Sequence, residues 1–364
     1  MITLYDLSRQ EEWDRIVKSF SDYEVFYLSG YSRAFREENA RNGDPLLLYY
    51  ENGPDRAVSV ILRRDIALDE NLKGKIPEGR YFDLITPYGY GGFFGNVSDW
   101  DHLNKEYAAY CLENHFICEF VRFELFSDYY AHYAGEITTR THNVVRSLDL
   151  PLEEIWMDFK AKVRKNVKRA NSHNLSIIIE PTGEYLKDFL RIYYSTMDRT
   201  DAENEFYFSE HFFRDLNEMR DNVMYFHAVH EGRIISTELV IYGAENAYSY
   251  LGGTEREYFD LRPNDFLKYE IIRWAVEKGL KNFVLGGGYG TDDGIFQYKQ
   301  ALAPKGIVEY YIGRRIFDRE MYDRLISLRG DAELNEQFFP LYRAAEIRKE
   351  TQQGVQDQEE DVTQ

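Results

Sequence analysis

Two stretches of the chain, about 180 residues apart, repeat the same pattern of hydrophobic and polar positions. Residues 26–29 read FYLS and residues 206–209 read FYFS, and a short helical pattern follows each of them. Next come alternating runs on both sides of a turn, at 46–65 and at 223–243. A period of two around Glu-Asn-Gly or Glu-Gly predicts a β-hairpin in each stretch.

Both stretches then continue alike, which extends the repeat well beyond the hairpins. A strand ending in glycines is followed by a helix and by a further strand, so the order helix, strand, strand, strand, helix, strand occurs twice. These elements are expected at 81–92, 101–115 and 116–126 in the first stretch and at 247–254, 264–280 and 281–287 in the second. The repeated order predicts a tandem duplication in a mixed α/β protein.

The second copy opens with an amphipathic pattern at residues 153–181. Its apolar positions recur at every fourth residue, which predicts a helix, and LSIIIE then predicts a strand. These positions are Ile155, Phe159, Val163 and Val167. A second helix is expected at 184–200, and the boundary between the copies near 148–152.

We therefore expect four segments. They are an N-terminal domain at 1–150, a C-terminal domain at 151–318, a helical segment at 319–350 and a disordered acidic tail at 351–364.

Composition narrows the classes of partner. The chain has 364 residues, which suits two domains, and a net charge of −19, which disfavours DNA and free duplex nucleic acid because phosphates need a basic surface. No window approaches the 18 or so apolar residues of a membrane span. The first residues, MITLYDLSRQEEW, lack the apolar core of a signal peptide, and two cysteines are too few for a disulfide framework, so we expect a cytoplasmic location.

The glycine-rich stretch LGGGYGTDDG at 285–294 raises the question of a nucleotide site. Thr291 stands where a dinucleotide fingerprint needs glycine, no Gly-Lys-Ser/Thr follows, and the two aspartates lack the spacing of a calcium loop. What remains is a strand end that needs positive φ and close backbone approach. Asp292 and Asp293 are interpreted as turn or helix-cap residues rather than catalysts.

Four stretches of the second copy carry a family resemblance. They are KVRKNVKRANSHNLSIIIE (162–180), LGGT (251–254), LRPNDFLKYEIIRWAVEKGLKNFVLGGG (261–288) and GIFQYKQALAP (294–304), to which the first copy adds TPYGYGG (86–92). Over roughly residues 20–315 the chain resembles the GNAT acyltransferases, and among them the tandem-GNAT Fem family of peptidoglycan bridge-forming aminoacyltransferases. The resemblance implies an α/β fold with mixed sheets, in which two tandem GNAT-like domains pack around a cleft.

The resemblance also implies an activity, the transfer of an acyl or aminoacyl group to an amine of a cell-envelope precursor. The acceptor would be a peptidoglycan peptide or a nucleotide-linked amino sugar, small or lipid-linked, and the donor acyl-CoA or aminoacyl-tRNA, with no tightly bound cofactor. The sequence departs from the family in two ways. It has no room for the long helical arm of many Fem transferases, and it has Tyr298-Lys299 where Phe-Lys is usual. Neither glycine-containing loop fits the usual CoA signature of GNAT domains, which resembles the Fem family, where the donor is an aminoacyl-tRNA.

The resemblance and the residue types together select candidate cations. Lys299 is a candidate to stabilise an oxyanion or a diphosphate, or a surface lysine. Arg164, Lys168 and Arg169 form a basic face that is either solvated or binds phosphates. Arg262 and Asn264 belong to a capping turn that could also face a ligand phosphate.

The uncharged candidates lie at strand ends. Tyr250, with Tyr88 and Tyr90, would orient the nucleophile or protonate a leaving group, unless these tyrosines only pack. Asp83 is a candidate general base, and Gly287 and Gly288 would form the floor of the site. No metal-ligand spacing and no Gly-x-Ser-x-Gly elbow occurs, so we expect no metal and direct attack without a covalent enzyme intermediate. The alternative function is a non-catalytic module that binds glycans or a protein.

Overall fold

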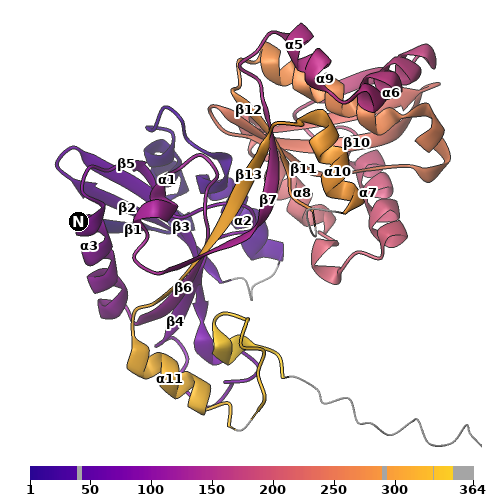
Figure 1. Cartoon of the computed structure of the whole chain (residues 1–364). Coiled ribbons are helices and arrows are strands. Elements are labelled where there is room, and N and C mark those ends of the chain that lie inside the picture. Colours follow the sequence, from indigo (N-terminus) through magenta and orange to yellow (C-terminus); the bar gives the residue numbers. More distant parts are fainter. Residues whose placement is uncertain (39–42, 289–292, 331, 347–364) are drawn as a thin grey trace, which may run out of the picture.

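The computed structural model describes residues 1–346 except 39–42, 289–292 and 331 (Figure 1). The acidic tail predicted at 351–364 lies outside the described residues. One mixed sheet of 13 strands runs through the molecule, with helices packed on its faces. The strand order is β1-β2-β3-β4-β6-β13-β7-β12-β11-β10-β9-β8, and β5 pairs with β3.

The first half holds the first copy of the repeat. Its elements are β1 (Ile2–Tyr5), α1 (Gln10–Val17), α2 (Ser29–Glu38), β2 (Asp44–Asn52), β3 (Asp55–Asp65), β4 (Phe82–Ile85), β5 (Phe94–Asn96), α3 (Trp100–Glu113), β6 (Phe116–Arg122), α4 (Tyr129–His132) and β7 (Glu136–Ser147). Short 3-10 turns lie at Leu7–Arg9, Val25–Tyr27 and Ile66–Leu68.

The second half repeats this order after two additional helices. Its elements are α5 (Leu152–Asp158), α6 (Ala161–Ser172), β8 (Ser176–Glu180), α7 (Leu186–Thr200), α8 (Glu210–Asn217), β9 (Val223–His230), β10 (Arg233–Tyr242), β11 (Asn246–Thr254), α9 (Pro263–Glu277), β12 (Asn282–Gly286), α10 (Gly294–Leu302) and β13 (Ile307–Ile316). A final helix, α11 (Arg319–Ser327), follows, and 3-10 turns lie at Asn204–Phe206, Arg220–Asn222, Arg256–Leu261 and Leu341–Arg343.

The predicted repeat and both predicted hairpins are confirmed. β2 pairs antiparallel with β3, and β9 with β10, where Glu231 and Gly232 both take positive φ in the turn. The one helix expected from residue 153 is instead two, because the backbone at Phe159 and Lys160 is extended. The Arg164 guanidinium binds the carbonyl oxygens of Met157 and Phe159, which satisfies carbonyls that the interrupted helix leaves free.

Each half completes the sheet of the other. β7 leaves the first half to pair antiparallel with β12, and β13 leaves the second half to pair antiparallel with β6. The two exchanged strands also pair with each other, and Figure 1 shows them crossing between the halves. The predicted boundary near 148–152 therefore falls after a strand that already belongs to the neighbouring sheet.

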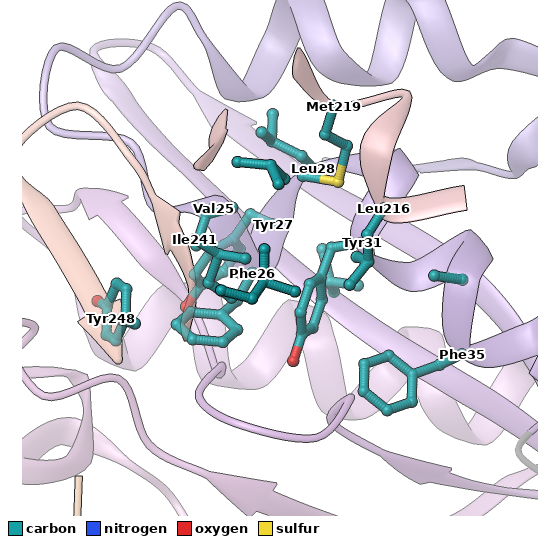
Figure 2. Packing of buried hydrophobic residues seen from close by; sticks show 14 of the residues in the cluster. Val25, Phe26, Tyr27, Leu28, Tyr31, Phe35, Leu216, Met219, Ile241 and Tyr248 are labelled. Carbon is teal, nitrogen blue, oxygen red and sulfur yellow. The ribbon is translucent and has the colours of Figure 1, made fainter. Parts of the chain in front are cut away.

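A shared core joins the halves. Helix α2 packs against α8, its counterpart in the repeat, and Phe35 makes ring contacts with Phe208 and Phe212. Figure 2 shows Tyr31 and Phe35 of the first half in one buried cluster with residues of the second half. Because this cluster is continuous, it buries the hydrophobic faces that each copy alone would leave exposed.

The C-terminal segment returns to the first half, where it pairs with Asp83. Helix α11 packs on β6, and Arg343 and Tyr342 reach Asp83 Oδ2 at 2.6 and 2.8 Å, while Arg64 reaches Oδ1 at 2.6 Å. Burial alone would raise the pKa of Asp83, but the two guanidinium groups outweigh it and hold this pKa below its ordinary value. Both carboxylate oxygens are thus occupied, so the candidate general base Asp83 is corrected to a structural anion.

Replacing Asp83 by Asn should lower the free energy of unfolding by about 3 kcal/mol, since two half-buried arginines lose the fully buried carboxylate that pairs with both. Urea unfolding at neutral pH measures this, and Asp323→Asn, at an exposed ion pair on α11, should cost about 1 kcal/mol at most. Because the pKa of Asp83 is lowered on folding, its contribution is present at neutral pH and fades as the pH falls through that lowered value. A D83N protein as stable as the wild type would contradict the structural role.

Candidate active site

A cavity of about 800 Å³ lies between the two halves. The first half contributes the ends of β4 and β6 and part of β7, and the second half contributes β11, β12, α10 and the segment around residues 204–208. This volume is typical of small-molecule sites. The strand exchange places β7 and β13 at its centre, where Asn143 and Tyr310 join the lining.

The second half opens its sheet toward this cavity. β11 and β12 pair in parallel only from Asn246–Asn282 to Tyr248–Val284, and beyond that point both strands contribute to the lining. The pairing of β10 with β11 shifts between Leu239 and Val240, which makes Tyr250 the extra residue of a β-bulge. A β-bulge changes the direction in which the neighbouring side chains point. Ser249 and Tyr250, which lie at this bulge, both line the cavity.

The corresponding opening in the first half is closed by its own chain. The Thr86 backbone N–H donates to Phe120 O at 3.1 Å, and its hydroxyl accepts from the Arg122 backbone N–H at 3.1 Å. Further on, the Gly91 backbone N–H donates to Arg122 O at 2.7 Å. The two copies of the repeat are therefore unequal, and only the second has parted strands at the cavity.

Lys299 lies on α10 and lines the cavity. Its ammonium donates to Gly287 O at 2.5 Å. Burial and the nearby ammonium of Lys268 lower the pKa of Lys299 to about 8, against the opposing effect of Glu238 and Asp293. Lys299 therefore remains a cation at neutral pH and loses its charge in mildly alkaline solution.

The three predicted tyrosines all line the same cavity. Tyr250 Oη lies 3.2 Å from Tyr31 Oη, and Tyr90 donates to Asn143 Oδ1 at 3.1 Å, while Tyr88 is partly exposed. Burial raises the pKa of Tyr250 and of Tyr90 well above 10. Both phenols thus stay protonated near neutral pH, which suits a proton donor and not a base.

The glycines at residues 286–288 form part of the cavity wall. Gly286 has a φ of +81°, and Gly287 and Gly288 line the cavity. A Cβ on Gly287 would lie 2.8 Å from His142 O, so only glycine fits beside β7 there. Asp293 caps α10 by accepting from the Phe296 N–H at 2.7 Å, whereas Asp292 lies outside the described residues.

Three arginines of the first half were missed as candidates. Arg64, Arg122 and Arg140 line the cavity together with Lys299, and no carboxylate is among the described residues of that lining. Arg64 is paired with Asp83, whereas the Arg122 guanidinium donates to the Thr86 carbonyl oxygen at 3.1 Å. Burial lowers the pKa of Arg122, and no carboxylate is prominent among its electrostatic neighbours. The repeat contained a signal for Arg122, because this residue ends the strand that corresponds to residues 281–287 of the second copy.

The predicted cations on α6 and α9 are not part of this cavity. Lys168 and Arg169 are exposed on α6, and Arg164 is held by the end of α5. Arg262 has a left-handed backbone at the start of α9, where Asn264 is half-buried. None of these five residues lines the cavity, so the structure does not bring them together with Lys299 and the tyrosines.

The start of α9 is occupied by its own residues. Pro263 supplies no N–H, and the buried Asp265 carboxylate accepts from Asn166 Nδ2 at 3.1 Å. Burial raises the pKa of Asp265 to about 6. In the described part of the chain, no cluster of three or more His, Cys, Asp or Glu residues is arranged to hold a metal ion. None of the helices described there is both long and apolar enough to cross a membrane.

Comparison with known proteins agrees with this geometry. Residues 157–300 match the family model described as an acetyltransferase (GNAT) domain. Among curated protein sequences there is no significant match. The structure resembles that of FemX with a TM-score of 0.64 at 13% identity, over 88% of this chain and 99% of FemX.

Two further solved structures share the fold. One is a conserved protein of unknown function from Bacteroides thetaiotaomicron, with a TM-score of 0.57 at 11% identity over 86% of this chain and 99% of that one. The other is the C-terminal domain of a protein assigned as a lysylphosphatidylglycerol synthetase from Agrobacterium fabrum, with a TM-score of 0.53 at 13% identity over 89% and 98%.

The class of protein follows from the fold and the matched domain. The chain has a tandem-GNAT fold, in which two copies of one order of elements exchange their last strands. Residues 157–300 of its second half match the GNAT acetyltransferase model, and the whole chain shares the fold of FemX. The predicted superfamily and fold class are thereby confirmed.

The pKa of Lys299 can be measured without any substrate. In a protein labelled with ¹³C at lysine Cε, the Lys299 resonance, assigned from a Lys299→Met spectrum, should titrate near pH 8, because burial and Lys268 disfavour its charge. Fully solvated lysines titrate near about 10.4 and serve as the reference. A Lys299 resonance that titrates with the solvated lysines would show that the ammonium is not held in the buried position described.

Proposed function

We propose that the chain is an acyltransferase that moves an acyl or aminoacyl group onto an amine of a cell-envelope precursor. The observation that carries the proposal is the charge of the cavity. The protein has a net charge of −19, yet the described lining of its central cavity has four cationic side chains and no carboxylate. A large concave site of one sign concentrates a ligand of the opposite sign.

The cavity has two ends, which differ in the side chains that line them. Lys299, Tyr250 and the parted strands β11 and β12 lie at the second-half end, and Arg64, Arg122 and Arg140 come from the first half. We assign the acyl carbonyl to the end with Lys299 and the phosphates of the acceptor to the arginines. A nucleotide-linked amino sugar, or a peptidoglycan or lipid-linked precursor with a diphosphate, has this combination of amine and anion.

The side chains of the cavity support direct transfer. Cys111 and Cys118 are buried away from it, and burial raises the pKa of both thiols. A thiol that stays protonated is a poor nucleophile. Ser249 lines the cavity, but its described partner is an ammonium rather than a base that could activate it. The acceptor amine would therefore attack the donor carbonyl itself, while the protein supplies position and charge.

The donor is acyl-CoA or aminoacyl-tRNA, and the start of α9 favours the second. A GNAT enzyme usually holds the CoA pyrophosphate at a helix N-terminus, where free backbone N–H groups and positive dipole attract it. Here Pro263 lacks the N–H, and the buried Asp265 occupies the first turn. The exposed Lys168 and Arg169 remain candidates for contact with a tRNA backbone.

A non-catalytic module that binds glycans or a protein is the second candidate function. The tyrosine-rich lining of the cavity, which includes Tyr88, Tyr207 and Tyr310, would suit a carbohydrate. Such a module would bind the ligand and transfer nothing, and it would not need the half-buried cation Lys299 at the parted strands.

Acyl transfer to a panel of acceptors, with acetyl-CoA and with charged tRNA as donors, tests the proposal. Lys299→Ala should lower kcat by about 10²-fold, because a cation that faces a developing oxyanion is lost. Arg324→Gln, at an exposed residue of α11, is the matched control and should leave the rate unchanged. Binding of an acceptor without transfer from any donor would favour the module.

The assignment of the phosphate end has its own test. Arg122→Gln should raise the KM of a diphosphate-bearing acceptor roughly tenfold, because a charge-assisted hydrogen bond is lost, and leave the KM of the same amine without phosphate unchanged. An equal change for both acceptors would contradict the assignment of the arginines to phosphate.

A further inference from the structure

Three polar side chains form a chain of contacts directly behind the cavity wall. Lys268 on α9 donates to Glu238 Oε1 on β10 at 2.5 Å and to Ser249 Oγ on β11 at 2.6 Å. Lys268 is 7% exposed and Glu238 4% exposed, whereas Ser249 lines the cavity. The contacts therefore connect a buried ion pair to the surface of the site.

The ion pair lies in an apolar environment. The neighbours of Lys268 on α9, Phe266 and Leu267, belong to the buried cluster of the second half, and the Lys268 ammonium lies 5.8 Å from the ring centre of Phe283. Burial of two charges costs several kcal/mol per ion, which the attraction between them only partly recovers. A hydrophobic pair at these positions would serve packing equally well, so packing alone does not explain the ion pair.

The ion pair fixes the direction of the Ser249 hydroxyl. An ammonium can only donate, so Ser249 Oγ must accept from Lys268 and its own proton has to point elsewhere. The described residues provide no other hydrogen-bond partner for this hydroxyl, and it faces the cavity. A hydroxyl that accepts from a cation is polarised, which makes it a stronger donor.

Ser249 is also close to the groups assigned to the acyl carbonyl. It is adjacent to Tyr250, the bulge residue, and Lys268 is near enough to Lys299 to lower the pKa of that residue. The bulge and the end of the β11–β12 pairing thus place a directed O–H in the same cavity as the Lys299 ammonium, on the wall where the two strands part.

We propose that Ser249 donates a hydrogen bond to the acyl oxygen in the transition state, and that Lys268, held by Glu238, is the positioning residue that aims it. This rests on the proposed acyl transfer. The amine nitrogen forms a bond to the acyl carbon, and the carbonyl π pair moves to the oxygen, which Ser249 and Lys299 stabilise. The pair then returns as the bond to the leaving ribose oxygen or CoA sulfur breaks, and that atom takes up the proton lost by the amine.

Kinetics with the best donor and acceptor pair test Ser249. Ser249→Ala should lower kcat by about 10²-fold with little change in the KM of the acceptor, as expected when one oxyanion donor is lost. Ser249→Thr, which keeps the hydroxyl and suits a strand, should retain most of the activity. The control is Ser236→Ala on β10, a buried serine outside the cavity lining that hydrogen-bonds Gly253 O. A kcat for S249A within threefold of S236A would overturn the role of Ser249.

A measurement without ligand tests the ion pair separately. By ¹³C NMR, Lys268→Met should raise the pKa of Lys299 by removing a like charge, and Glu238→Gln should lower it by removing an opposite one. Shifts in opposite directions cannot arise from a general loosening of the fold. Lys278→Met, at an exposed residue that follows the same helix, is the control and should leave this pKa unchanged.

The kinetic experiment and the NMR titration distinguish failure of the proposed function from failure of the positioning role. Absence of transfer to every acceptor, together with opposite shifts in E238Q and K268M, would refute the proposed function and leave the coupling of the ion pair to the cavity intact. A Lys299 pKa that does not move in either variant would refute the positioning role of Lys268, whatever the activity.

Discussion

The structure depends on the exchange of one strand between its halves. β7 completes the sheet of the second half and β13 that of the first, and the two strands are hydrogen-bonded to each other. Neither sheet is complete without the other half, because an edge strand left unpaired exposes its backbone groups. The exchange also brings Asn143 and Tyr310 to the centre of the molecule, between Arg122 of one half and Lys299 of the other.

The two halves share one order of elements but are unequal at the cavity. In the second half β11 and β12 part beyond Tyr248 and Val284, and the space between them belongs to the cavity. In the first half Thr86 and Gly91 bridge the same place with hydrogen bonds to β6. The first half consequently contributes arginines instead of an open cleft, whereas the second half contributes Lys299 and the parted strands.

The sequence predicted the fold well because its information is local and repeated. Period-two runs, turn residues and the matched FYLS and FYFS segments defined most strands and the order of both copies. The strand at 136–147 and its exchange were not predicted, since pairing partners far apart in the chain leave no local pattern. The helix break at Lys160 was missed because the apolar positions Ile155, Phe159 and Val163 keep their spacing across it.

The sequence identified cavity residues only where a candidate residue type stood in a recognisable sequence motif. Lys299, Tyr250 and the glycines stood in recognisable strand ends or in the family-like segment, and they do share one cavity. Asp83 is a carboxylate, as a general base needs to be. Its partner Arg343 lies 260 residues further along the chain, so the local sequence pattern does not connect the two. Arg122 and Lys268 look like ordinary members of a strand and a helix. Only the tertiary structure shows that Arg122 lines the cavity and that Lys268 lies behind its wall, bonded to Ser249.

The central claim is that the cavity between the halves holds an anionic amine acceptor with its reacting end beside Ser249 and Lys299. A crystal structure with a nucleotide-linked amino sugar bound tests it most directly. The account predicts phosphate oxygens within hydrogen-bond distance of Arg122 and Arg140, and the amine directed toward the wall formed by Ser249, Tyr250 and Gly287. A ligand bound on another face of the molecule, or bound in the cavity with its phosphates at Lys299 and its amine at the arginines, would contradict it.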